Sequence, residues 1–167
     1  MRRIGLSEDQ RDNLLINTNL VMQMLDEIGQ SPYKTFESIS RFADLLAACR
    51  GYAFSPRISH HKVTDNTEIT LIEPPCGSNT AILTSMGETL FIDSGYALYT
   101  EEMTALLRNL LPGFDTMKKR IYITHADVDH CGLLPMFDEI IASRRTKECL
   151  ELEYKGQNGF REQGGKL

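Results

Sequence analysis

The sequence lacks the long apolar run of a membrane protein and the paired cysteines of a disulfide or zinc framework. No stretch is long and apolar enough to cross a bilayer. Residues 1–9 carry two arginines with no apolar segment behind them, so we expect no signal peptide. The four cysteines are scattered without a Cys-x-x-Cys pair, which predicts free thiols in a reducing compartment. These absences together predict a soluble, cytoplasmic protein.

Basic charge is also in deficit. The 167 residues include 18 Lys+Arg against 23 Asp+Glu, a formal net charge of −5. This balance argues against a surface that coats nucleic acid broadly, because such a surface must neutralise many phosphates. The hydrophobic content of 41% is that of an ordinary globular chain with a buried core.

The first third of the chain has helical periodicity. Ser7 and Gln10 form a capping box, and apolar residues then recur at helical spacing until Gly29. After Ser31-Pro32, a second apolar stripe runs from Phe36 to Cys49, before Gly51. We predict a helical hairpin over residues 7–50, within an N-terminal region of residues 1–55. An apolar stripe of this kind packs on its own domain or on a partner, and we expect its own domain.

The pattern changes to that of an α/β domain over residues 56–145. Apolar runs predict strands at residues 68–72, 81–85 and 89–93, the last two joined by the short loop 86–88. A helix is predicted from Thr100 to Leu111, then a buried strand over 120–124. Residues 133–141 read as another helical stretch, with Pro135 near its start. The remainder, residues 146–167, is a polar tail that we expect to be weakly ordered beyond a short helix at 148–155.

The densest chemical information follows the predicted strand 120–124. The segment Thr124-His-Ala-Asp-Val-Asp-His-Cys-Gly132 places two imidazoles and two carboxylates within six residues. The carboxyl end of an α/β sheet commonly holds the functional site. Imidazole and carboxylate together suit divalent zinc, iron or manganese, and one tight loop can serve two ions.

At these residues the sequence resembles the metallo-β-lactamase fold superfamily. The superfamily pattern His-x-His-x-Asp-His-x-Gly stands here as His125-Ala-Asp127-Val-Asp129-His130-Cys-Gly132. A second element, Asp93-Ser-Gly95 after a predicted strand, is similar to the superfamily's Asp-x-Gly. The resemblance covers about residues 63–145 and implies the N-terminal half of an αββα sandwich.

The resemblance also implies roles for individual residues. His125 and Asp127 would hold one divalent metal ion, and Asp129 and His130 a second. Asp129 would in addition orient the attacking hydroxide, which makes it the candidate catalytic residue. Asp93 would support the loop without touching a metal.

Two departures from the superfamily pattern shape the expectation. Asp127 stands where most members have His, and this hard oxygen donor favours manganese or iron over zinc. The flavo-di-iron reductases of the superfamily carry Glu at this place. The superfamily's second half, which supplies further metal ligands, has no counterpart in this sequence. We therefore expect an incomplete site, in a truncated or split protein or a degenerate domain. A missing C-terminal half, another chain or a second copy would complete it, and the chain alone would be inactive.

Three functions remain open on these grounds. The first is a metal-dependent hydrolase, in which a metal-bound hydroxide attacks an ester, phosphodiester or related bond. The second is a di-iron oxidoreductase-type site. The third is a non-catalytic interaction module that acts through the helical hairpin. His60 and His61 are expected to be ordinary polar residues of a loop or edge strand, and Cys131 a small buried residue.

Overall fold

The computed structural model describes residues 6–155, with side chains to residue 151. The chain divides into two compact units, one up to Leu45 and one from Leu46 onward. The sequence placed a boundary at residue 55 instead. The difference arises because Leu46 and Cys49 already pack against the core of the second unit.

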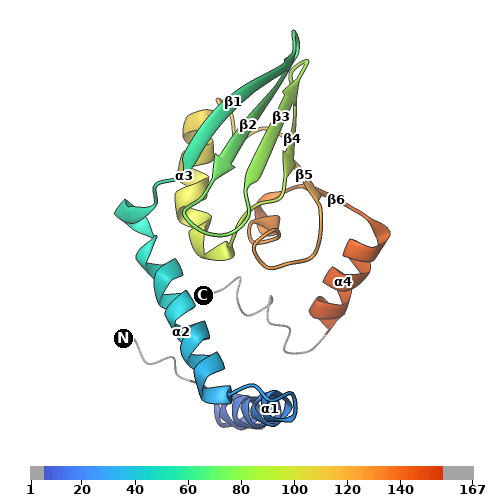
Figure 1. The fold of residues 1–167 in the computed structure, drawn as a ribbon. Helices are drawn as coiled ribbons and strands as arrows, with labels where there is room; N and C mark the ends of the chain where they lie inside the picture. Colours follow the sequence, from blue (N-terminus) through green and yellow to red (C-terminus); the bar gives the residue numbers. More distant parts are fainter. Residues whose placement is uncertain (1–5, 156–167) are drawn as a thin grey trace. The chain divides into compact units, whose positions relative to one another are not determined.

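The first unit contains α1 (Glu8–Glu27) and the greater part of α2 (Pro32–Ala48) (Figure 1). The predicted capping box is present, since the Ser7 hydroxyl accepts from the Gln10 N–H and the Gln10 side chain accepts from the Ser7 N–H. Gly29 ends the first helix with φ +71°, a backbone conformation that glycine adopts without strain.

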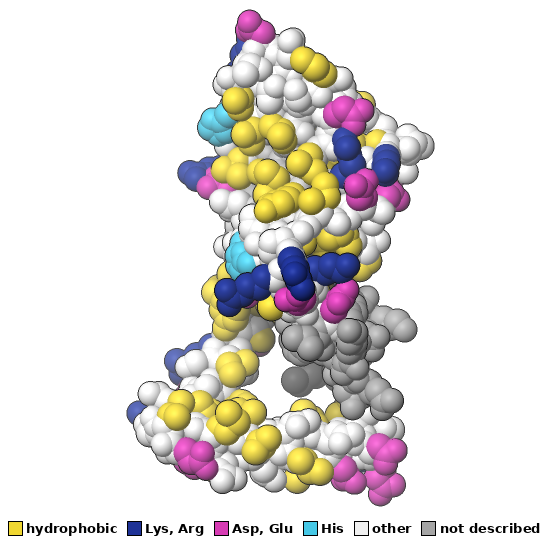
Figure 2. Space-filling model, turned by 90° about the vertical axis from the view of Figure 1, so that its right-hand side faces the viewer, with side chains coloured by type: hydrophobic (Ala, Val, Ile, Leu, Met, Phe, Trp, Pro, Cys, Tyr) yellow, Lys and Arg dark blue, Asp and Glu magenta, His cyan; other side chains and the backbone are white. Residues whose placement is uncertain are grey.

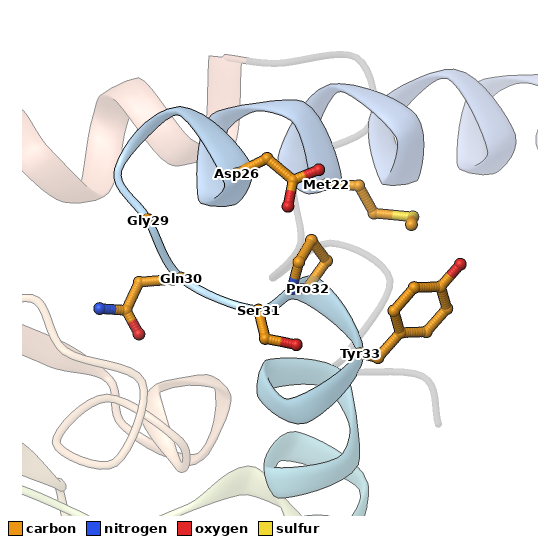
Figure 3. Close-up of a pocket in the computed structure, with 7 residues that line it drawn as sticks. All are labelled: Met22, Asp26, Gly29, Gln30, Ser31, Pro32 and Tyr33. Atoms are coloured by element: carbon orange, nitrogen blue, oxygen red, sulfur yellow. The ribbon is translucent and has the colours of Figure 1, made fainter.

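The two helices do not form the predicted hairpin. No residue of α1 is buried, and Leu15, Ile16 and Ile28 are each at least 64% exposed. The helices meet at the turn around Gly29, where a surface hollow opens (Figure 3). A hairpin would bury one apolar stripe against the other, so this expectation was wrong within the unit.

The second unit is built on one six-stranded sheet with the strands in sequence order. Strands β1–β4 form an antiparallel meander, whereas β4, β5 and β6 run parallel. The strands are β1 (Arg57–Thr64), β2 (Thr67–Glu73), β3 (Thr80–Ser85), β4 (Glu88–Ile92), β5 (Arg120–Ile123) and β6 (Glu139–Ala142). The helical elements are η1 (Gly51–Ala53), η2 (Ala97–Tyr99), α3 (Thr100–Leu110), η3 (Leu134–Met136) and α4 (Arg144–Lys155). The predicted α/β class is thus confirmed.

Residues 133–141 do not form the predicted helix. Pro135 lies in the short η3, and the chain then enters strand β6. The Asp138 side chain accepts from the Lys119 N–H at 2.8 Å, and the Asp138 N–H donates to the Lys119 carbonyl. These bonds align the chain beside β5, and the β-branched pair Ile140-Ile141 suits the strand that follows. The predicted helix at 148–155 is part of α4, and residues 156–167 of the predicted tail lie outside the described residues.

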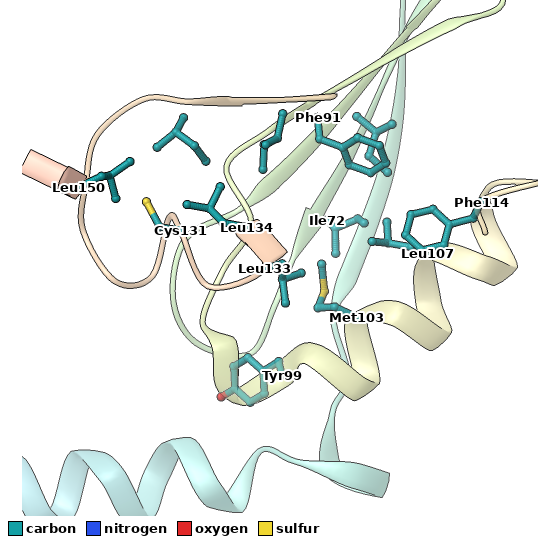
Figure 4. Packing of buried hydrophobic residues seen from close by; sticks show 13 residues of the cluster. Ile72, Phe91, Tyr99, Met103, Leu107, Phe114, Cys131, Leu133, Leu134 and Leu150 are labelled. Atoms are coloured by element: carbon teal, nitrogen blue, oxygen red, sulfur yellow. The ribbon is translucent and has the colours of Figure 1, made fainter. Parts of the chain in front are cut away.

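The core lies between one face of the sheet and α3 (Figure 4). Helix α3 inserts Met103 and Leu107 against that face, and both are almost fully buried. The sheet contributes fully or almost fully buried side chains, namely Ile72, Ile82, Phe91, Ile121 and Ile123. Because side chains alternate along a strand, the residues between these belong to the opposite face of the sheet.

That opposite face is also apolar. We call it the sheet patch, and the strand register assigns it Ile69, Leu71, Ala81, Leu83, Leu90, Ile92, Tyr122 and Ile141. All eight residues are partly or largely exposed, with Tyr122 at 37% and Ile141 at 38%. Figure 2 shows hydrophobic side chains gathered on the surface of the sheet region. The second unit, as described, therefore covers one face of its sheet with α3 and leaves the other uncovered.

Candidate functional site

Two loops meet at the carboxyl ends of the neighbouring parallel strands β4 and β5. The Ser94 N–H donates to the His130 carbonyl at 3.0 Å, and the Ser94 hydroxyl donates to the same carbonyl. The Leu133 N–H donates to the Ser94 oxygen, and the Gly132 N–H donates to the Gly95 carbonyl. Ser94 is fully buried. These bonds fix the histidine–aspartate loop to the loop after β4.

Gly132 is required by this close approach. A Cβ atom on Gly132 would overlap backbone atoms of Gly95, Tyr96 and Ala97, none of which can swing aside like a side chain. Glycine is therefore sterically required at position 132, the last position of the His–Asp pattern.

Asp93 is the central buried acid of the site. Its carboxylate accepts from the Thr124 N–H at 2.9 Å, from the Thr124 hydroxyl at 2.7 Å, and contacts His130 Nδ1 at 2.9 Å. The side chain is 9% exposed, and its backbone has φ +55°, which strains a residue with a Cβ atom. Asp93 thus holds the loop after β5 and the imidazole of His130 together.

The contact with Asp93 fixes the tautomer of His130. An ionised carboxylate only accepts hydrogen bonds, so Nδ1 carries the proton and donates. Nε2 of the neutral ring is then left with its lone pair. That atom lies 3.8 Å from Asp129 Oδ2.

His125 is oriented in the same way through one intermediate residue. The Thr124 hydroxyl gives its only proton to Asp93, so it accepts at 2.9 Å from the Nδ1–H of His125. His125 Nε2 therefore also carries the lone pair, and it lies 3.4 Å from Asp127 Oδ2. The two imidazole rings lie close, with centroids 3.8 Å apart.

The spacing within each pair suits a shared metal ion. Two ligand atoms, each about 2.1 Å from one ion and at a tetrahedral angle, are about 3.4 Å apart. The His125–Asp127 pair matches this separation, and the Asp129–His130 pair is slightly wider. Imidazole nitrogen and carboxylate oxygen are also the donor types that zinc, iron and manganese accept.

Neither His–Asp pair supplies enough ligands to hold a metal ion by itself. Among the described residues, no three His, Cys, Asp or Glu side chains converge in a way that could hold a metal ion. The two pairs also differ in exposure, from 75% for the Asp127 side chain to 19% for His130. The residues therefore fit a metal site in donor type and pair spacing, but each pair supplies only two ligands.

A third loop, between β2 and β3, supports Asp129. The Ser78 hydroxyl donates to the Asp129 carbonyl, and the Tyr96 ring lies so close to Gly77 that a Cβ atom there would overlap it. Burial raises the pKa of Tyr96, and the negative charge of Asp129 and the nearby Cys76 thiol add to the rise. Tyr96 is thus an uncharged side chain beside Asp129.

Sequence reasoning missed Ser94 and Thr124, which join the two loops. The sequence showed only where they stand, each at the end of a strand and next to a residue of the predicted site: Ser94 follows Asp93, and Thr124 precedes His125. A hydroxyl there can bond in many ways, and only the fold shows that one links Asp93 to His125.

The two remaining histidines lie outside the cluster. His60 and His61 belong to the edge strand β1, where they contact the Thr70 and Ser59 hydroxyls at 2.9 Å. None of the four cysteines forms a disulfide, and Cys131 is buried as expected, with its thiol donating to the His125 carbonyl at 3.4 Å. The hollow at the α1–α2 turn has one carboxylate, Asp26, and no histidine or cysteine.

The fold and the site define an α/β protein with a histidine–aspartate cluster at the carboxyl ends of two parallel strands. No family model matches the chain, and a search of curated proteins finds no match. Among solved structures, the chain is similar to a flavoprotein from Thermotoga maritima, with 23% identity and a TM-score of 0.47. That match covers 60% of this chain and 30% of the other.

Two variants of a flavo-di-iron protein from the same organism match in a similar way. Their identities are 22% and 24%, both with a TM-score of 0.46, and they cover 59% and 60% of this chain. The chain spans about 30% of the length of these structures. The matched structures are thus a flavoprotein and variants of a flavo-di-iron protein. No described helix is long and apolar enough to span a membrane.

Proposed function

We propose that this chain carries half of a two-metal site of a metallo-β-lactamase-type hydrolase. The observation that carries the proposal is the arrangement around Asp93. Through His130 directly, and through Thr124 to His125, one buried carboxylate turns both imidazoles so that Nε2 faces an aspartate. A buried acid that orients imidazole ligands is a recurring feature of metal sites.

His125 and Asp127 would hold one divalent ion, and Asp129 and His130 the other. Asp127 adds an oxygen donor, so we favour manganese or iron over zinc. A bound ion supplies a Lewis acid that lowers the pKa of a coordinated water toward neutrality. The substrate class we propose is an ester, a phosphodiester or a related hydrolysable bond.

Asp129 is the residue that we assign to catalysis. Its side chain is 26% exposed, so it can reach both a metal and the water that attacks the substrate. Its backbone is held by Ser78, and the neutral Tyr96 lies close by. Asp129 would accept a proton from the water and would orient the lone pair of the water oxygen toward the substrate.

Both pairs need further ligands, because two donors do not fill the coordination sphere of these ions. We propose that the remaining ligands come from a segment beyond the described residues or from another chain. The cysteines form no disulfide, which agrees with a reducing, cytoplasmic location, and we include this location in the proposal.

A di-iron oxidoreductase site is the second candidate, and the oxygen donor at Asp127 favours it. The two candidates differ in what they require. Iron in stoichiometric amounts and an electron donor support the oxidoreductase, whereas ester or phosphodiester cleavage with redox-inert zinc supports the hydrolase.

Metal titration of the full chain tests the proposal. Calorimetry with Mn²⁺, Zn²⁺ and anaerobic Fe²⁺ should show binding that weakens at least tenfold in His130→Ala and in His125→Ala. His61→Ala is the matched control, because this histidine lies on β1 and contacts Ser59. Binding that His130→Ala and His125→Ala leave unchanged, or an equal loss in His61→Ala, would contradict the proposal.

A further inference from the structure

The sheet patch has the apolar composition of a surface that packs against another layer. Its side chains are aliphatic except for Tyr122 and form two continuous rows across the strands. One row runs through Leu71, Ala81, Ile92, Tyr122 and Ile141, and the other through Ile69, Leu83 and Leu90. A sheet that is apolar on both faces requires a layer on each. The second unit supplies one layer, α3.

The size of the face is sufficient for an interface. The whole sheet face, including β1, has six strands spaced about 4.8 Å apart and about 19 Å long on average, which gives an area on the order of 500 Å². Two such faces would bury about 1,000 Å², which is near the lower limit for a specific interface. The packing of two sheets face to face is also a common solution for such surfaces.

The charges at the margin of the patch are compatible with a second copy of this chain as the occupant. At one end Arg57 pairs with Glu73, and at the other Arg120 pairs with Glu88 and Lys118 with Glu139. Three basic and three acidic groups balance, so two copies of this face can approach without net repulsion. Helix α1 is different, because its five acidic residues and one arginine would repel a second copy.

The patch adjoins the candidate metal site. Ile92 directly precedes Asp93, and Tyr122 stands two residues before Thr124, so the patch continues into both loops of the site. A two-fold axis that lies between two stacked sheets, along the strand direction, would place both half-sites at the same end of the interface. Each half-site would then lie near the histidines and aspartates of the other copy.

We propose that the sheet patch binds a second copy of this chain, and that the pair brings two half-sites together at one end. This inference rests on the proposed function for the role of the site, but not for the contact itself. The contact is isologous and buries Leu83 near its centre.

Sedimentation equilibrium of the full chain, with metal removed, tests the contact. The expected mass is twice the chain's 18.9 kDa. Leu83→Lys should shift the chain to monomer, as should Ile141→Lys at a position that is already 38% exposed and therefore tolerates a charge in the folded monomer. Leu20→Lys on α1, at a residue 54% exposed, is the matched control and should leave the dimer intact. Circular dichroism verifies that each variant is folded.

The outcomes separate the inference from the proposed function. A monomeric wild type, or a dimer that Leu20→Lys dissociates and Leu83→Lys does not, overturns the inference. A Leu83-dependent dimer that binds no metal supports the contact and refutes the proposed function. A monomer that binds metal refutes the contact alone. If both hold, Leu83→Lys should weaken metal binding at least tenfold, because the partner's ligands are lost.

Discussion

Asp93 and His130, 37 residues apart in the chain, meet through a 2.9 Å contact between Oδ2 and Nδ1. The contact joins the loop after β4 to the loop after β5 and decides which imidazole nitrogen faces outward. The same carboxylate oxygen accepts from Thr124, whose hydroxyl in turn orients His125. A single buried acid thus orders the whole candidate site.

Asp93→Asn should weaken metal binding about 10- to 100-fold, because residues that orient metal ligands commonly contribute this much. The amide would replace a carboxylate that accepts three contacts with a group that has one acceptor oxygen. Calorimetric titration measures the affinity, and Asp65→Asn at an exposed loop is the control. Imidazole nitrogen NMR of the metal-free wild type should show the proton of His130 on Nδ1, and a proton on Nε2 would contradict the mechanism.

Gly132→Ala should destabilise the second unit by about 2–4 kcal/mol, in the upper range of single substitutions. The added Cβ overlaps backbone atoms of the neighbouring loop, so the two loops must separate. Gly87→Ala is the matched control: its Cβ meets no atom within 4 Å, and only its φ of +83° adds strain of about 1–2 kcal/mol. Urea unfolding measures both, and an equal or larger loss in Gly87→Ala would disprove the steric argument.

The sequence was sufficient for most local elements of this fold. Strands β2–β4, helix α3 and the capping box of α1 follow from periodicity and cap chemistry that act within a few residues. Residues 133–141 were mispredicted because a short apolar run fits a buried helix and a buried strand equally. The strand forms because hydrogen bonds between Lys119 and Asp138 align this part of the chain beside β5.

The candidate site was predictable in part. The sequence placed His125, Asp127, Asp129 and His130 in one loop, because they are neighbours in the chain. The resemblance implied the pairs His125–Asp127 and Asp129–His130, but the sequence did not show that Asp93 and Thr124 orient the two imidazoles, since those hydrogen bonds join two different loops. The hairpin was mispredicted for a related reason. Amphipathic spacing shows that a stripe needs cover, but not which surface supplies it.

Leu107→Ala should reduce the stability of the second unit by about 2–5 kcal/mol, the usual range for a buried leucine. Leu107 is fully buried where α3 meets the sheet. Leu15→Ala, at a side chain that is 66% exposed on α1, should change stability by less than about 1 kcal/mol. Thermal or urea unfolding followed by circular dichroism distinguishes the two, and similar losses would mean that α1 is covered in solution.

The stability of the second unit should decline at alkaline pH because of Tyr99. Burial raises the pKa of this phenol to about 12, and the nearby thiols of Cys49 and Cys76 add to the rise. Its hydroxyl donates to the Leu46 carbonyl at 3.3 Å. The unfolded phenol ionises near pH 10, whereas the folded one stays protonated until about pH 12.

The stabilising effect is therefore complete below pH 10 and is lost as the pH rises from 10 to 12, by at most about 3 kcal/mol. Tyr99→Phe removes the ionisable group and should flatten this part of the stability curve, even if the lost hydrogen bond lowers stability uniformly. Urea unfolding of both proteins at intervals from pH 8 to pH 11.5 measures the difference. Parallel curves for the two proteins would show that the ionisation of Tyr99 does not limit alkaline stability.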